Sequence, residues 1–401
     1  MNSDTTVSVG EKDLGTHKNG HGDEICGFAL LIHGDPRYKN AKVFTYGSDA
    51  EAIAAEAKAN GSLTLVGIGR GKFDEHGKNN EECAATLVAR HLKVDELKFF
   101  RLLEEVRSCD LEAKAERTQI PEILKALYDH NPEGEVIAWG LKAYGVLVAA
   151  CEAGNYKPDS TGILEEVCCS LTDKFANTGN GEAMRRAWTD CQKAVRNGRE
   201  SLTQLKTVAE LIAQSEGIEA AKKWAAVGIE AIFQRQLDFE IAFDMIVKDS
   251  QPFHAWYFRA GQNGESDIRR KFAGVALQGD NSQLNRVFRS NRLAKWIGMQ
   301  LDLLIVRNED GHVQVFSNDK SEVPMVLVAK SLRYAEARKR GIKVSFDDLA
   351  VEGDCRQVPQ WYYFAAGMVF NGSKSHPNTP VTCLSNDEIL NAVINAFNPG
   401  R

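Results

Sequence analysis

The sequence predicts an α/β protein with a parallel-sheet N-terminal domain, a helical middle region and a smaller α/β C-terminal domain. In the first third of the chain, short apolar strands alternate with helices, which is the pattern of a parallel sheet covered by helices. Residues from about 96 to 250 keep a helical pattern, and strand-like runs return beyond about 300. We place the domain boundaries at 13–170, 171–255 and 256–401.

Local signals define the elements of the N-terminal domain. Ser48 has the N-cap position of a helix, with Glu51 three residues later in a capping-box spacing, and Asn60-Gly61 ends that helix. The helix EECAATLVARHL is predicted to start at Asn80 or Glu81. The remaining elements are a strand at 12–16, a helix at 25–33, a strand at 42–46 and a buried strand at 63–68.

The C-terminal domain is predicted from turn and cap residues. An Asp-Gly turn joins two strands at 301–307 and 312–316 into a hairpin. A helix at 330–340 ends at Gly341, and WYYFAAGMVF at 361–370 forms buried strands. A final helix at 385–397 has Ser385 as its N-cap and Glu388 three residues later. We expect no internal repeat.

Composition indicates an ordinary globular protein. The 401 residues are 43% hydrophobic and 26% charged, and the net charge of −6 gives no overall attraction to nucleic acid. No apolar run reaches 18 residues and the first 13 residues lack a signal-peptide core, so we expect a cytoplasmic protein without a membrane partner. The nine cysteines form no CxxC pair, which favours buried thiols over a zinc cluster.

The loop after the first strand has the composition of a metal site. Two imidazoles and two carboxylates lie within eight residues, at His17, His21, Asp23 and Glu24. Histidine suits Mn, Fe or Zn, and carboxylate favours Mg or Mn, so the mixture points to a Mn-like ion. A solvated polar turn with Asp23 as a helix N-cap explains this segment equally well.

A second polar segment follows the strand at 63–68. Asp74, Glu75 and His76 come directly after a glycine-rich loop, at the end of a strand where α/β folds bind ligands. On its own the tripeptide also fits a surface turn.

These motifs and their order resemble the DHH phosphoesterase superfamily, and most closely its branch of metal-dependent hydrolases named for the melanocyte proliferating gene product. Thr16-His17, His21 and Asp23-Glu24 match the branch's T-H-N-G-x-F-H-x-D-E motif with a gap one residue shorter. Phe73 to His76 matches F-D-H-H with one substitution, and the segment from Glu104 to Asp110 resembles the fourth motif. The resemblance covers residues 13 to about 112, and more faintly 230–401, including WYYFAAGMVFNGSK.

The resemblance implies roles for individual residues. His17 and His21 would hold one divalent metal, most simply Mn, with Mg, Fe and Zn as alternatives. Asp23, Glu75 and Asp110 would hold a second metal. His76 would face the phosphate as a catalytic residue, and Asp74 would orient its neighbours. In the C-terminal loop, Lys374 and His376 would clamp a substrate phosphate, where an exposed loop without that role is the alternative.

Two positions depart from the family pattern. Gly67 stands where the second motif carries an Asp that bridges the two metals, and Glu75 replaces the first His of the DHH triplet. One interpretation is a remodelled site with its charge preserved. The other is a site with one metal or none, and without catalysis.

A basic stretch in the C-terminal half is a candidate for nucleic-acid binding. Arg286, Arg289 and Arg292 recur every three residues, so a single helix would present them on one face, with Trp296 nearby to stack on a base. A solvated helix face whose arginines pair with acidic neighbours is the alternative.

The function that these observations favour is metal-dependent hydrolysis of a phosphodiester, with metal-bound water as the nucleophile. The partner would be a nucleotide or the end of a single-stranded nucleic acid, contacted by Arg286 and Arg289. The alternative is a catalytically degenerate DHH-fold protein that binds a nucleotide or a protein partner. A phosphatase for a small phosphorylated metabolite is a third option, and it would not need the arginines.

Overall fold

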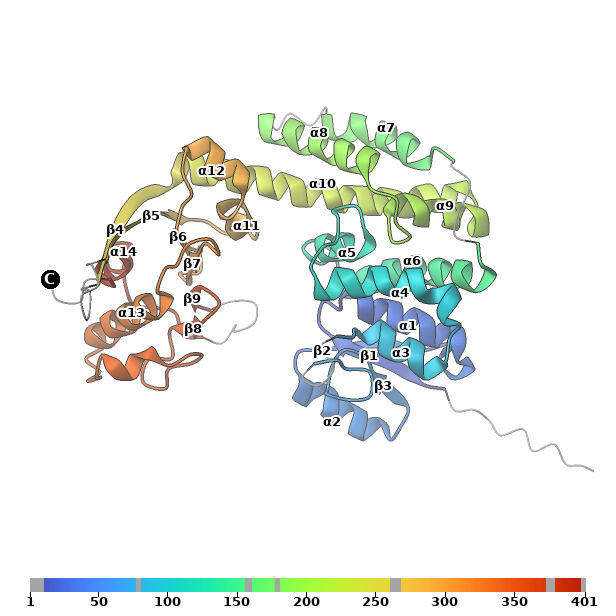
Figure 1. Ribbon diagram of the computed structural model, residues 1–401, viewed down its shortest axis with the longest axis horizontal. Helices are drawn as coiled ribbons and strands as arrows, with labels where there is room; N and C mark the ends of the chain where they lie inside the picture. Colours follow the sequence, from blue (N-terminus) through green and yellow to red (C-terminus); the bar gives the residue numbers. More distant parts are fainter. Residues whose placement is uncertain are drawn as a thin grey trace, which may run out of the picture. The chain divides into compact units, whose positions relative to one another are not determined.

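The computed structural model divides the chain into two units, residues 1–237 and 238–401, which are coloured along the chain in Figure 1. It describes residues 11–76, 81–155, 161–176, 181–259, 268–372 and 379–397. The domain boundaries expected at 170/171 and 255/256 fall inside a helix and a strand, α7 and β4, whose bounds follow.

The N-terminal unit begins with alternating strands and helices and continues as helices. Its first elements are β1 (Asp13–His17), α1 (Gly22–Gly34), the 3-10 helix η1 (Pro36–Tyr38), β2 (Val43–Tyr46), α2 (Asp49–Ala59), β3 (Leu63–Leu65) and α3 (Ala84–Leu92). The helical part comprises α4 (Glu96–Leu111), α5 (Ile120–Tyr128), α6 (Glu133–Ala153), α7 (Ile163–Ala176), α8 (Gly181–Asn197), α9 (Leu205–Glu216) and α10 (Ile218–Asp249), the last of which runs into the second unit.

The predicted parallel sheet is present as three strands in the order β2-β1-β3. Leu63 and Leu65 pack with Ala52 of α2 on one face. Leu14 belongs instead to the main core with α1 and α3, and Figure 1 shows these helices on the opposite side from α2. Gly15 keeps the α2 face tight, because a Cβ there would lie 2.9 Å from Leu65 and from the Tyr46 ring. The sheet is therefore covered on both faces, which brings the carboxyl ends of its strands together.

One core joins the sheet to the helices. The buried apolar cluster runs from Leu14 to Phe233 and includes residues of α1 and α3 through α10. Among the described helices, α6 alone has the length and apolar composition to cross a membrane. Half of the most apolar 18-residue stretch of α6 is buried inside the protein. The helix packs against α1, α4, α5 and α9, as a core helix does.

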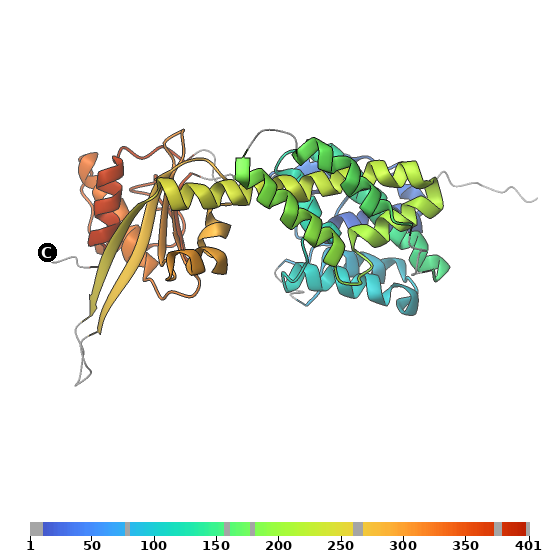
Figure 2. The ribbon, with the colours of Figure 1, turned by 90° about the horizontal axis from the view of Figure 1, so that it is seen from above.

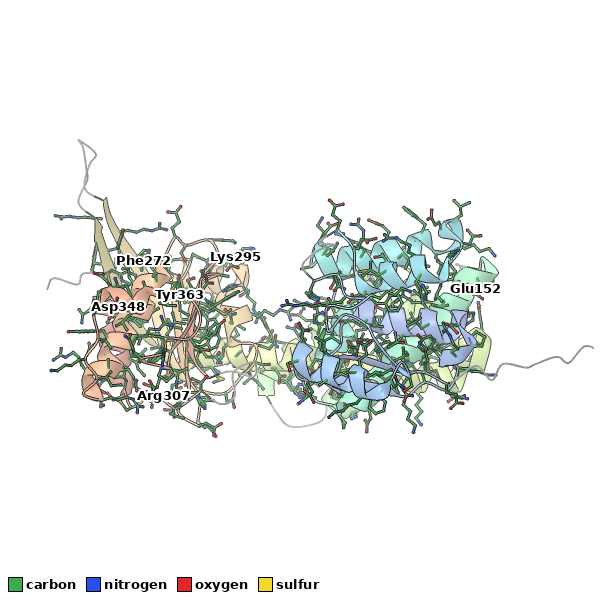
Figure 3. The ribbon with its side chains drawn as sticks, turned by 90° about the horizontal axis from the view of Figure 1, so that it is seen from below. Glu152, Phe272, Lys295, Arg307, Asp348 and Tyr363 are labelled. Atoms are coloured by element: carbon green, nitrogen blue, oxygen red, sulfur yellow. The ribbon has the colours of Figure 1, made fainter. Side chains whose placement is uncertain are left out.

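The C-terminal unit is built on a six-stranded sheet in the order β4-β5-β6-β7-β9-β8, in which only β5 and β6 are parallel. Its elements are β4 (Gln251–Arg259), β5 (Ile268–Gln278), α11 (Leu284–Phe288), α12 (Asn291–Ile297), β6 (Leu303–Arg307), β7 (Val313–Ser317), α13 (Met325–Lys339), η2 (Asp347–Ala350), β8 (Tyr362–Phe364), β9 (Met368–Asn371) and α14 (Asn386–Asn395). Figure 2 shows the long β4–β5 ribbon, and Figure 3 labels Phe272, which is fully buried in β5 and packs on Phe397.

Several sequence predictions are confirmed in detail. Ser48 accepts a hydrogen bond from the Glu51 N–H, and Ser385 and Glu388 form a reciprocal capping box at α14. The hairpin of β6 and β7 is present, with Gly311 at φ 88° in its turn.

Three predicted elements differ from the structure. The strand expected at 63–68 ends at Leu65, because Gly67 and Gly69 adopt positive φ and turn the chain away. The next helix begins at Ala84 and not at residue 80 or 81, since the carboxylate of Asp23 accepts the Ala84 N–H at 3.0 Å. The prediction of a single helix that aligns Arg286, Arg289 and Arg292 is wrong, because Ser290 interrupts it and caps a separate helix, α12.

Candidate metal centre

The candidate centre lies where β1 ends and α1 begins. His17 is the last residue of β1 and pairs with Tyr46 of β2, and His21 is the N-cap residue of α1. Their rings approach edge to face, with centroids 4.9 Å apart. The short polar loop thus turns two imidazoles toward the first turn of α1, which carries Asp23 and Glu24.

Glu24 binds both histidines. Its side chain, 1% exposed, accepts the backbone N–H of His21, and one carboxylate oxygen lies 2.6 Å from His17 Nε2. Burial disfavours the charged carboxylate, but the hydrogen bond from His17 and the charges of His17 and His21 lower the pKa of Glu24 overall. Burial would also lower the pKa of His17, yet its bond to Glu24 raises that pKa to about 9. The two residues therefore form an ion pair in which Glu24 is buried and His17 is partly exposed.

Asp23 and Glu75 each turn an unpartnered oxygen into the same region. Asp23 is 2% exposed; one of its oxygens accepts the Ala84 N–H, and the other, Oδ1, has no hydrogen-bond partner among the described residues. Glu75 is 8% exposed, and its Oε2 also has no partner in the part of the chain that the structure describes. Burial, followed by the charges of Glu24, Asp110 and Glu75, raises the pKa of Asp23. Burial, with smaller contributions from Glu24 and Asp110, raises the pKa of Glu75 to about 7.

Asp110 completes the cluster from the last turn of α4. Donor atoms of His21, Asp23 and Asp110 lie within 4.8 Å of one another, and so do those of His17, His21 and Glu24. Burial and the charge of Glu24 raise the pKa of Asp110. Two three-donor groups therefore share His21, and their carboxylates repel one another without a cation between them.

Asp74, Glu75 and His76 form a third group of donors within 4.8 Å. Asp74 Oδ1 accepts both the backbone N–H of His76, at 2.9 Å, and its ring Nδ1, at 2.8 Å. Burial disfavours the Asp74 anion, but its bonds to His76 lower the pKa of Asp74 overall. The side chain of His76 stays 68% exposed, so Asp74 holds an accessible imidazole beside the cluster.

Gly67, which has no side chain, leaves room in the site for the carboxylate of another residue. Gly67 has φ 68°, and a Cβ on it would lie 2.5 Å from Oε1 of Glu24. The Glu24 carboxylate thus occupies the space that a residue-67 side chain would need.

Glu24 was absent from the ligand set that the sequence suggested, although it belongs to the same motif. The signal that could have identified it is its spacing. A Glu three residues after an N-cap folds back onto that cap, which here places its carboxylate between the two histidines.

The other candidate residues lie in the C-terminal unit. Arg289 forms an ion pair with Asp319 at 2.9 Å and donates to the Ser317 carbonyl, while Arg286 contacts Gln283 at 3.5 Å. Arg292 pairs with the fully buried Glu240. Arg289 and Arg292 are thus held by acidic neighbours. Lys374 and His376 lie outside the described residues.

The cluster fits a divalent cation by its donor chemistry. Imidazole and carboxylate donors together suit Mn, Fe or Zn, and a cation would satisfy the buried oxygens of Asp23 and Glu75 that have no partner. It would also offset the mutual repulsion that raises the pKa values of Asp23, Glu75 and Asp110.

Comparisons with known proteins yield distant structural similarities. No family model and no curated protein sequence matches the chain. The crystal structure of CDC45 from Entamoeba histolytica is similar over 96% of this chain and 95% of its own, with 10% identity and a TM-score of 0.31. An uncharacterized protein from Helicobacter pylori G27 is similar over 97% and 100%, with 12% identity and a TM-score of 0.21. Similarities this distant assign neither a family nor an activity to the chain.

Proposed function

We propose that this chain is a divalent-metal-dependent phosphoesterase that hydrolyses a phosphodiester in a nucleotide or at a nucleic-acid end. One observation supports the proposal most strongly: buried, unpartnered oxygens of Asp23 and Glu75 belong to a cluster that also holds His21 and Asp110. A protein does not usually bury unsatisfied carboxylate oxygens without a cation to bind, because their desolvation is costly.

The residues divide into three roles. His21, Asp23 and Asp110 would hold one cation, and Glu24 with the two histidines offers donors for a second. A divalent cation supplies a nucleophile at neutral pH, by lowering the pKa of water, and neutralises charge on a phosphoryl group. His76, kept accessible by Asp74, would donate a hydrogen bond to a phosphate oxygen.

The substrate class follows from the resemblance of residues 13–112 to the DHH phosphoesterases and from the basic residues of the C-terminal unit. Arg286, Arg289, Lys374 and His376 are the proposed phosphate-binding residues of that unit. Arg289 would have to release or share its ion pair with Asp319 to bind phosphate.

The decisive experiment measures metal content and turnover together. Purified protein would be loaded with Mn, desalted and analysed for bound metal, and then assayed with bis(p-nitrophenyl) phosphate and short oligonucleotides. Wild type would be compared with His21→Ala and Asp23→Asn. His33→Ala is the matched control, since His33 lies at the other end of α1 and pairs with Glu152, labelled in Figure 3.

The proposal requires bound Mn and phosphodiester hydrolysis in wild type and in His33→Ala, with both lost in the two cluster variants. Metal bound without hydrolysis of any substrate would favour the catalytically degenerate binding protein. No metal after Mn loading would refute the hydrolase.

A further inference from the structure

The helical part of the N-terminal unit contains a repeated arrangement of three helices, contrary to the expectation from sequence. Helices α4, α5 and α6 correspond in order to α8, α9 and α10, and equivalent residues are 85 positions apart. When residues 96–153 are compared with the residues 85 positions later, the identical pairs are Arg101 and Arg186, Thr118 and Thr203, Gln119 and Gln204, and Trp139 and Trp224. So few identities explain why the repeat is not evident in the sequence.

Reciprocal contacts show that the two copies face each other across a pseudo-twofold axis. The N–H of Ile120 donates to the Thr203 carbonyl at 2.8 Å, and the N–H of Leu205 donates to the Thr118 carbonyl at 2.9 Å. Likewise, the indole N–H of Trp139 donates to the Trp224 carbonyl at 3.1 Å, and that of Trp224 to the Trp139 carbonyl at 3.2 Å. Each contact is repeated with the roles of the two copies exchanged.

The symmetry relates the metal centre to a second position. Beside the first copy, α1 packs on α4, α5 and α6, and the carboxylate of Asp110 at the end of α4 joins the cluster. Beside the second copy, α7 packs on α8 and α9, and Phe175 of α7 stacks on Phe233 of α10. The equivalent of Asp110 is Val195, 85 residues later at the end of α8.

That second position is a cavity of about 370 Å³ between the start of α7, the end of α8 and the start of α9, lined by Leu164, Val195 and Leu205 among others. Its chemistry is the opposite of the metal centre. Four cations line it, Arg101, Arg196, Arg199 and Lys206, together with the carboxylates of Glu200 and Glu210.

The cations are able to bind an anion. Arg199 meets Glu116 through Nε at 3.0 Å and Arg101 meets Glu105 through Nε at 3.4 Å, which leaves further N–H groups of each guanidinium to donate. Among the described residues, neither Arg196 nor Lys206 forms an ion pair. Thr118 also lines the cavity with its hydroxyl group, and the first turn of the 12-residue helix α9 contributes its dipole.

We propose that this cavity binds the phosphate group of a small anionic ligand, as a second site distinct from the metal centre. Arginine forks and a lysine charge around a recess are the arrangement that recognises phosphate through charge-assisted hydrogen bonds. The volume is at the lower end of the range for small-molecule sites, which suits a compact phosphorylated molecule.

The test uses the full chain, freed of metal by chelation and desalting so that the metal centre cannot hold the probe. Inorganic pyrophosphate is titrated calorimetrically into wild type, Arg196→Ala, Lys206→Ala and Lys193→Ala. Lys193 lies on α8 one turn before Arg196 and does not line the cavity, so its variant removes the same charge as a control.

We expect a saturable site that weakens with salt, about tenfold weaker in Arg196→Ala and in Lys206→Ala, and unchanged in Lys193→Ala. Absence of saturable binding would overturn the proposal. Equal affinity in wild type and both cavity variants would overturn it as well.

Discussion

Glu24 and Gly67 occupy one space: the carboxylate of Glu24 lies where a side chain at position 67 would have to be, with Oε1 2.5 Å from the Cβ that Gly67 lacks. The donors of the centre are therefore arranged around a glycine. Glu24 folds back from α1 and joins His17 and His21.

Substitution at Gly67 should destabilise the N-terminal unit. Gly67→Ala would force a non-glycine residue to φ 68° and displace the buried Glu24, at a cost of about 2–4 kcal/mol. Gly71→Ala is the control, because a Cβ there meets nothing within 4 Å. Chemical denaturation measures both, and equal stability of the two variants would show that Glu24 is not held against Gly67.

Neutralising Asp23 should have opposite effects on stability without and with metal. Asp23→Asn keeps an acceptor for the Ala84 N–H but removes a buried charge that Glu24, Asp110 and Glu75 repel, so the metal-free variant should be more stable by about 1–2 kcal/mol. Added Mn should raise the unfolding temperature of wild type and leave that of Asp23→Asn unchanged. Thermal unfolding with chelator and with Mn measures both effects, and a variant that Mn still stabilises would remove Asp23 from the ligand set.

The hydrogen bonds of the stacked tryptophans should contribute to the stability of the N-terminal unit. The rings of Trp139 and Trp224 lie 4.5 Å apart at an angle of 7°. Trp224→Phe removes one indole donor and leaves the buried Trp139 carbonyl without it, which should cost about 2 kcal/mol or more. Trp188→Phe is the matched control, since Trp188 is also buried but its indole N–H has no partner among the residues that the structure describes. The control should lose less stability in urea unfolding; the reverse order would contradict the role given to the reciprocal bonds.

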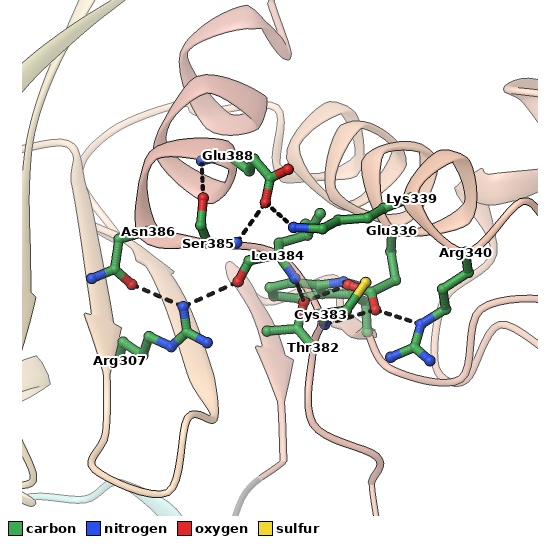
Figure 4. A network of polar contacts seen from close by, with 11 residues as sticks. Arg307, Glu336, Lys339, Arg340, Thr382, Cys383, Leu384, Ser385, Asn386 and Glu388 are labelled. Atoms are coloured by element: carbon green, nitrogen blue, oxygen red, sulfur yellow. Dashed lines mark hydrogen bonds and ion pairs between the residues drawn. The ribbon is translucent and has the colours of Figure 1, made fainter.

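The C-terminal unit should lose stability in acid through Glu336. Figure 4 shows this carboxylate accepting from Arg340, Thr382 and the backbone of Cys383. Burial disfavours its charge, but these bonds lower its pKa overall from the usual value of 4.5. A lowered folded-state pKa means that the stabilisation is complete above pH 4.5 and is lost as the pH falls through the folded-state pKa.

Glu336→Gln should therefore cost about 2–4 kcal/mol at pH 7, and the difference from wild type should shrink in acid. Thermal unfolding over a pH series measures this. Glu322→Gln provides the control, because the side chain of Glu322 is 91% exposed and its pairing with Arg270 should contribute little. A difference that stays constant with pH would mean that Glu336 does not titrate with unfolding.

The sequence predicts features that depend on neighbours along the chain better than those that depend on distant ones. Ser48 with Glu51 and Ser385 with Glu388 specify helix starts locally, and the structure confirms both. The start of α3 could not be predicted this way, because its first N–H is bound by Asp23, 61 residues earlier. The break at Ser290 was visible as a serine, but the three-residue spacing of the arginines suggested a continuous helix.

The candidate centre shows the same division. Its histidines and Asp23 are evident from one loop, since they are close in sequence. The contact between Glu24 and Gly67 depends on how α1 packs against the turn after β3, which no local pattern encodes. The repeated helices were missed for a related reason. Packing preserves apolar character at equivalent positions, as in Leu102 and Ala187 or Val106 and Cys191, without preserving identity.

The single core that joins Leu14 to Phe233 also determines when the protein can fold during synthesis. Until α9 and α10 have left the ribosome, α6 lacks its contact with α9, and Trp139 has no ring to stack on. The nascent chain therefore carries an incomplete core until the end of this unit has been translated. During that interval we expect the chain to be open to chaperones and to proteases.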